Sequence, residues 1–221
     1  MQTPEVLVVG DANPDLVLTG DVVPRFGQAE QAGRGRASSW AVRRRSRRAG
    51  SHGSASAPSL AAVVGDDVHG RLVRDLLVER GVGVGSLQVH PTLATGLTVV
   101  LQPDGGGDRA ILTSTGTIDA LRADDVEVPA GVRHVHVASY FLQPALAAGL
   151  PGLLQRARDA GATTSLDTNW DPAGRWHDVR DVLPLVDVLL PNAAEPARGH
   201  RRRRRRAGRR AACSPRARPW C

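Results

Sequence analysis

Residues 61–81, AAVVGDDVHGRLVRDLLVERG, decide the fold. The apolar run Ala61–Gly65 is typical of a strand buried on both faces of a parallel sheet. Asp66 is predicted to cap a helix that extends to about Arg80, and Gly81 is predicted to end it. One face of that helix carries four apolar side chains: Val68, Leu72, Leu76 and Leu77. A buried strand followed at once by an amphipathic helix predicts an α/β unit.

Strands and helices alternate on both sides of this unit. We predict further strands at 5–10, 16–19, 132–138, 163–167 and 186–190. A helix is predicted at 144–160, with a proline near its start and Gly161 after its end. Residues 97–102 and 109–113 are predicted to form a hairpin. The pattern favours a three-layer α/β sheet flanked by helices.

Polar clusters follow four of the predicted strands, at residues 10–15, 65–67, 167–169 and 191–195. In an open parallel sheet, ligands bind beyond the carboxyl ends of the strands. A single aspartate there is more often a helix cap than a binding group. Four such clusters in one topology predict a rim of carboxylates and amides suited to sugar hydroxyls and hydrated Mg²⁺.

These clusters, in this order, resemble the ribokinase-like (PfkB) family of carbohydrate kinases. Residues 8–20, VVGDANPDLVLTG, are similar to the family's first strand and turn, and residues 63–82 resemble its Gly-x-Asp-x-x-Gly turn. Asn192 to Glu195 match the family's Asn-x-x-Glu motif. The resemblance covers residues 4–30 and 60–195.

The resemblance implies a ribokinase-like sheet with a small β lid, built from about residues 15–27 and 96–113. It implies that Asn13 and Asp15 bind substrate hydroxyls. It also implies ATP and Mg²⁺ as cofactors. The residues expected to order phosphate and Mg²⁺ are Asp167, Asn169, Asn192 and Glu195, with Glu195 reaching the metal indirectly through water.

Two family motifs are missing from this sequence. The Gly-Ala-Gly-Asp motif, which carries the catalytic Asp, is absent, so no catalytic residue is assigned. The substrate-binding Gly-Gly expected between Glu30 and Leu60 is absent as well. We therefore expect a partial kinase domain over 1–195, incomplete at its C-terminus, with impaired phosphorylation of a sugar or nucleoside-like hydroxyl.

Eighteen of the 29 arginines lie in two short blocks, at 34–48 and 198–218, that contain no acidic residue. The rest of the chain keeps 11 arginines against 22 acidic residues, so its net charge is −11 although the whole chain carries +7. The abundance of Gly, Ala, Arg and Pro indicates a GC-rich gene. If the codons of Trp40–Ser46 in such a gene are read one base out of register, they encode roughly Leu-Gly-Gly followed by small residues. We hypothesise that residues 31–58 are an anomalous out-of-frame insert and that residues 196–221 are a disordered tail with the same origin.

Other interpretations stay open. The chain is alternatively a non-catalytic remnant, or an arginine-rich protein that binds nucleic acid through phosphate contacts. We expect only non-specific nucleic-acid binding, no membrane association and a possible homodimer through the β lid. We also expect a cytoplasmic location, because both cysteines lie in the tail and no disulfide framework is implied. His134 and His136 share a strand face, but no third metal ligand is in register with them.

Overall fold

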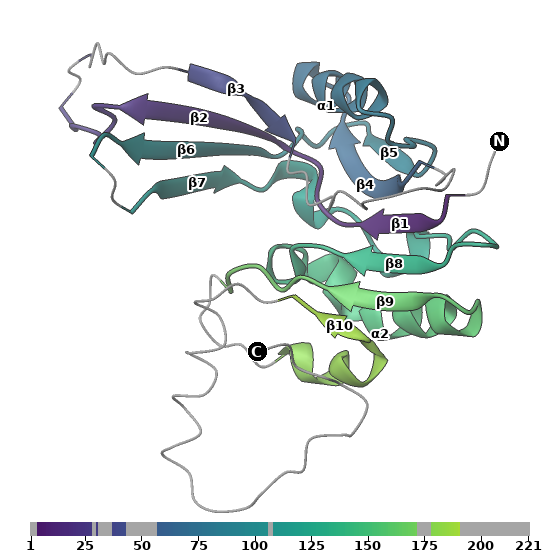
Figure 1. Ribbon diagram of the computed structural model, residues 1–221. Coiled ribbons are helices and arrows are strands. Elements are labelled where there is room, and N and C mark those ends of the chain that lie inside the picture. The colour runs from purple at the N-terminus through teal and green to yellow at the C-terminus, as the bar shows by residue number, and fades with distance from the viewer. Residues whose placement is uncertain are drawn as a thin grey trace, which may run out of the picture.

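The computed structural model describes residues 4–27, 30, 37–42, 57–105, 108–171 and 178–190, with only the backbone described for 37–42. Two sheets make up this part of the chain (Figure 1). The first is a six-stranded central sheet with helices packed on it. The second is a four-stranded sheet that extends from the side toward which β1, β8 and β9 point.

The central sheet has the order β10-β9-β8-β1-β4-β5, and every neighbouring pair is parallel. Its strands are Val188–Leu189, Thr163–Leu166, His134–Val137, Val6–Val9, Ser59–Gly65 and Leu87–His90, respectively. Because all the strands are parallel, their carboxyl ends lie along one edge. This edge faces the second sheet.

One helix packs on each face of the central sheet. Helix α2, Pro144–Asp159, covers one face, and its fully buried Leu150 and Leu153 join the larger apolar cluster with Leu7 and Val135. Helix α1, Val68–Glu79, covers β4 on the other face, where Val73 packs in a smaller cluster. The result is the predicted three-layer arrangement, helix on sheet on helix.

The second sheet, called the lid here, has the order β3-β2-β6-β7. Its strands are Ala37–Val42, Pro14–Gly20, Leu97–Pro103 and Ala110–Ser114. Strands β2 and β6 run parallel, and β6 and β7 form the predicted antiparallel hairpin. Since β2 begins five residues after β1 ends, the lid starts at the carboxyl edge of the core.

Short 3₁₀ turns connect the larger elements. They are Gly116–Asp119, Ala123–Asp125, Tyr140–Leu142, Asp178–Asp181 and Leu183–Leu185. The sequence pattern did not predict them, because 3₁₀ turns are too short to show a period.

Two predictions about α1 are wrong. The N-cap is Asp67, not Asp66, because the side chain of Asp67 accepts a hydrogen bond from the Gly70 amide. Val68 is 65% exposed and does not share the buried face, which Val73 occupies instead. The predicted end of the helix is correct, since Gly81 follows it with φ of +70°.

The sequence also predicted no element between residues 31 and 58, and the structure has β3 there, paired antiparallel with β2. Strand β5 was not predicted either, although it pairs with β4 at the edge of the central sheet. The predicted tail, 196–221, lies outside the described residues.

Candidate functional site

Asn13 and Asp15 lie where the chain passes from the core into the lid. Both side chains are buried, with 4% and 7% of their surface exposed. The Asn13 amide, Nδ2, donates to Thr98 Oγ1 at 2.9 Å and lies 3.4 Å from Asp15 Oδ1. A buried amide and carboxylate beside each other form a polar group at the root of the lid.

Thr98 completes this group, and sequence reasoning missed it. It lies opposite Asp15 in the β2–β6 register, is 4% exposed, and its hydroxyl is 3.1 Å from that of Thr113 in β7. Thr98 and Val100 both point to the buried face of β6, so the alternation of that strand was the signal available in the sequence.

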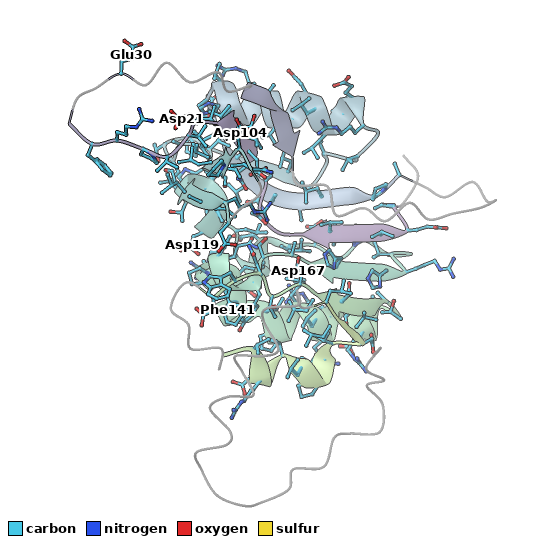
Figure 2. The ribbon with its side chains drawn as sticks, turned by 60° about the vertical axis from the view of Figure 1, so that its left-hand side comes forward. Asp21, Glu30, Asp104, Asp119, Phe141 and Asp167 are labelled. Carbon is cyan, nitrogen blue, oxygen red and sulfur yellow. The ribbon has the colours of Figure 1, made fainter. Side chains whose placement is uncertain are left out.

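The turns after β8 and β9 are fastened together at the same edge. The Tyr140 amide donates to the carbonyl of Asp167 at 3.2 Å, and the Phe141 amide donates to that of Thr168 at 3.2 Å. Figure 2 shows Phe141 and Asp167 on this part of the core. Ser139 and Asn169, one in each turn, both have φ of +56°. Left-handed backbone outside glycine is uncommon and clusters at functional sites.

Asp167 and Asn169 shape the turn after β9. Asp167 is 4% exposed, and its Oδ1 accepts a hydrogen bond from the Asn169 amide at 3.1 Å. Asn169 Oδ1 in turn accepts from the Trp170 amide at 2.8 Å. Both side chains therefore hold the backbone of the turn in addition to lying at the rim.

The described candidate residues share one edge of the central sheet. Asn13 follows β1 and Asp167 follows β9, with β8 between these strands. Neighbouring strands are about 4.8 Å apart, so the two strand ends are about 10 Å apart. Asn192 and Glu195 lie outside the described residues, so their placement stays a prediction.

Asp67, the third strand-end aspartate, has a structural partner set. Its carboxylate accepts hydrogen bonds from the amides of Gly70 and Thr95 and from the Thr95 hydroxyl, each at 2.7 Å. Burial raises the pKa of Asp67, but these hydrogen bonds and the nearby His69 outweigh burial, and the net pKa is lowered. Asp66 is exposed and pairs only loosely with Arg71, at 3.5 Å.

The described residues contain no group of three or more His, Cys, Asp or Glu side chains that could hold a metal ion. These residues alone therefore do not form a Mg²⁺ cage. Mg²⁺ in phosphotransfer sites is commonly held by one or two carboxylates together with substrate phosphates and water. The prediction of Mg²⁺ depends on Glu195, which is not among the described residues.

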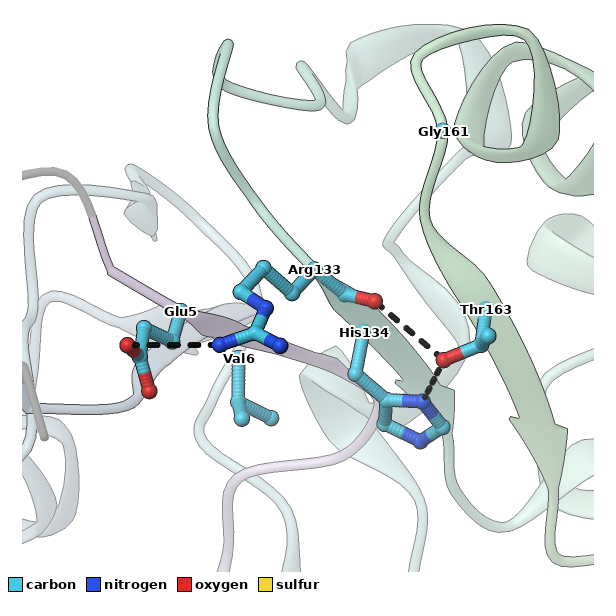
Figure 3. A pocket seen from close by; sticks show the side chains of 6 residues that line it. All are labelled: Glu5, Val6, Arg133, His134, Gly161 and Thr163. Carbon is cyan, nitrogen blue, oxygen red and sulfur yellow. Dashed lines mark hydrogen bonds and ion pairs between the residues drawn. The ribbon is translucent and has the colours of Figure 1, made fainter.

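A shallow hollow lies at the opposite edge of the sheet, among Glu5, Val6, Arg133, His134, Gly161 and Thr163 (Figure 3). His134 bonds Thr163 Oγ1 at 2.8 Å and Ser165 Oγ at 2.7 Å, and His136 bonds the same Ser165 at 2.8 Å. These ring nitrogens are used within the sheet. The hollow lies at the amino ends of β1, β8 and β9, away from the edge where α/β sheets bind ligands.

Among the described residues, no helix is both long and apolar enough to span a bilayer.

A parallel sheet between helices, with a small β sheet rooted at its polar carboxyl edge, defines the described part of the chain as an α/β domain. The chain belongs to the pfkB family of carbohydrate kinases, whose family model matches residues 6–199. No curated protein matches the chain.

Solved structures share this fold at low identity. A ribokinase from Arabidopsis thaliana complexed with ribose and ATP is 21% identical, with a TM-score of 0.63, and the match covers 89% of this chain and 62% of that one. A fructokinase from Xylella fastidiosa with bound ATP is 18% identical, with a TM-score of 0.60 and coverages of 85% and 61%. An E. coli protein in complex with ATP and Mg²⁺ is 18% identical, with a TM-score of 0.64 and coverages of 87% and 63%. The chain thus spans about three fifths of the length of each.

Proposed function

We propose that this chain binds a sugar or nucleoside-like polyol at the root of the lid. We also propose that it takes part in the ATP-dependent phosphorylation of one hydroxyl of that polyol. The observation that carries the proposal is the buried group of Asn13, Asp15 and Thr98 at the carboxyl edge of the core. Family membership supports the reaction class.

Asn13 and Asp15 have complementary hydrogen-bonding chemistry. A carboxylate accepts hydrogen bonds from hydroxyl groups, and an amide side chain both donates and accepts. Burial strengthens such bonds, because water does not compete for the same groups. A pair of adjacent sugar hydroxyls therefore fits this group, and the lid sheet beside it excludes solvent.

We propose that ATP lies on the β9 side of the edge. Asp167 and Asn169 would line the phosphate region, and Asn192 and Glu195 would order Mg²⁺, with Glu195 acting through water. Mg²⁺ would neutralise charge on the phosphates. The support is the order of the strands, together with the ATP and Mg²⁺ complex of a protein with the same fold.

We further propose that phosphoryl transfer by this chain is slow. The sequence has neither the Gly-Ala-Gly-Asp motif nor the Gly-Gly pair expected between Glu30 and Leu60. A positioned general base contributes about 10²-fold or more to rate, and a charge-stabilising donor contributes a similar factor. Sugar binding requires neither the general base nor the charge-stabilising donor, but the missing Gly-Gly pair is substrate-binding in the family. We therefore expect weak sugar binding and a larger loss of turnover.

Titration calorimetry with ribose, fructose and adenosine tests the binding proposal. Asp15→Asn keeps the shape and the carbonyl near Asn13 but removes the charge, so affinity should fall about tenfold or more. Asp21→Asn is the matched control, because Asp21 is an exposed carboxylate directly after β2 and is paired with Arg25. Equal affinities for the two variants would exclude Asp15 as a substrate group. A coupled ATPase assay then measures turnover, and rapid turnover would contradict the proposed impairment.

Strand β7 forms an exposed edge of the lid. All five residues of β7 are exposed, including Ile111 and Leu112 at 43% and 60%. An apolar edge strand is a pairing surface. We propose a homodimer through this edge. Sedimentation of the parent chain and of Leu112→Glu tests the dimer, because the added charge should dissociate it.

We also propose that the chain makes only non-specific contacts with nucleic acid and that its location is cytoplasmic.

A further inference from the structure

We propose that Asp67 is a positioning residue for substrate binding, which fixes the point where β6 enters the lid and thereby holds Thr98 against Asn13. The inference rests on the proposed role of Asn13. It assigns Asp67 a function that differs from a rim carboxylate and from a helix cap alone.

The carboxylate of Asp67 connects α1 with the loop before β6. Asp67 Oδ1 accepts from the Gly70 amide and from the Thr95 hydroxyl, while Oδ2 accepts from the Thr95 amide, all at 2.7 Å. One carboxylate therefore joins the first turn of a core helix to a residue 28 positions further along the chain.

Thr95 is buried, with 4% of its surface exposed. Its hydroxyl donates to Asp67 and accepts from the Gly65 amide at 2.8 Å. Thr95 is therefore bound to the end of β4 and to the start of α1 at the same time. A side chain added at Gly65 would meet the carbonyl of Leu93, so this turn requires glycine.

Thr95 lies close in the chain to Thr98, which contacts Asn13. Thr95 lies two residues before β6 begins at Leu97, and Thr98 accepts the Asn13 amide hydrogen bond at 2.9 Å. Thr98, whose hydroxyl orients Asn13, is the third residue after the anchored backbone of Thr95. The residue before Thr95 is held as well, because the Thr117 amide donates to the Ala94 carbonyl at 2.9 Å.

Asp67→Asn separates the two functions of this carboxylate. The carbonyl oxygen of Asn can still accept from the Gly70 amide and cap α1. Its NH₂ group would then face the Thr95 amide, and two donors cannot bond. Asp66→Asn is the matched control, since it makes the same charge change one residue away, at a side chain 71% exposed.

The experiment is amide hydrogen exchange on the unliganded chain, with circular dichroism to check folding. In Asp67→Asn we expect the Thr95 amide and residues 97–103 to exchange roughly tenfold faster, while 68–79 and 144–159 keep the parent rates. Asp66→Asn should match the parent. Faster exchange only in 68–79, a uniform increase, or no change would each overturn the proposal.

Thr95 provides a second pair of variants that does not alter the carboxylate. Thr95→Val removes the bridging hydroxyl and should accelerate exchange in β6, whereas Thr95→Ser keeps the hydroxyl and should restore the parent rates. If the valine and serine variants exchange alike, the hydroxyl bridge does not position β6.

Sugar affinity is measured separately on the same variants. If the parent binds sugar, Asp67→Asn should weaken binding at least fivefold and Asp66→Asn should leave it unchanged; equal affinities would overturn the link to Asn13. If the parent binds no sugar, the proposed function fails, while the exchange data still decide whether Asp67 holds the lid.

Discussion

Gly70 is the position at which the packing of the strand-to-helix turn can be tested most directly. A Cβ atom at Gly70 would meet the carbonyl oxygen of Gly65 and would lie 3.0 Å from Thr95 Oγ1. Gly152, in the middle of α2, is the matched control. Its added Cβ would meet only Arg156 Nη1, at an ordinary 3.7 Å.

The two substitutions to alanine should change the free energy of unfolding in opposite directions. Alanine is favoured over glycine in a helix by about 1 kcal/mol, and both positions gain this term. At Gly70, overpacking against backbone costs about 1–3 kcal/mol, and loss of the Asp67 cap costs about 1 kcal/mol more. We therefore expect Gly70→Ala to destabilise by about 1–3 kcal/mol and Gly152→Ala to stabilise by about 0.5–1 kcal/mol.

Thermal and urea unfolding followed by circular dichroism measure both effects. For a domain of this size, 1 kcal/mol shifts Tm by about 2–4 °C, so Gly70→Ala should lower Tm by roughly 2–12 °C. A Gly70→Ala variant as stable as the parent would show that Gly65, Gly70 and Thr95 are not packed together. The proposed anchoring of the lid by Asp67 would then lose its geometric basis.

Three further predictions concern other parts of the molecule. Burial lowers the pKa of His134, against the opposing charge of Asp187, so the folded chain binds fewer protons than the unfolded chain just below pH 6.5. The free energy of unfolding should therefore fall as the pH drops through that range. In His134→Gln, the free energy of unfolding measured by urea titration should depend less steeply on pH. Asp119→Ala removes the acceptor for the Ala145 amide at 2.9 Å and should cost about 1 kcal/mol in urea unfolding. Leu150→Ala, in a fully buried site, should cost about 2–5 kcal/mol, and a loss below 1 kcal/mol would contradict the described core.

The core elements could be predicted from the sequence because their signals are local. Strand β4 and helix α1 follow from a continuous apolar run and a 3.6-residue period, and α2 follows from its proline start and glycine stop. Parallel strands share a carboxyl edge, so the placement of Asn13 and Asp167 on one edge followed from the predicted parallel sheet, whereas the order of the strands required the structure. Strand β5 was missed because it is a short edge strand whose pattern is half polar.

Tertiary structure decided which polar groups are partners. The sequence predicted Asp66 as the helix cap, but Asp67 is the cap in the structure, and its carboxylate is also held by Thr95, which lies 28 residues away. The contact between Asn13 and Thr98 spans 85 residues and depends on the parallel pairing of β2 with β6. Periodicity identifies which side chains are buried, because burial follows from each element's own geometry. Partners across the fold depend on how the elements pack, so the hydrogen bonds at the root of the lid required the three-dimensional structure.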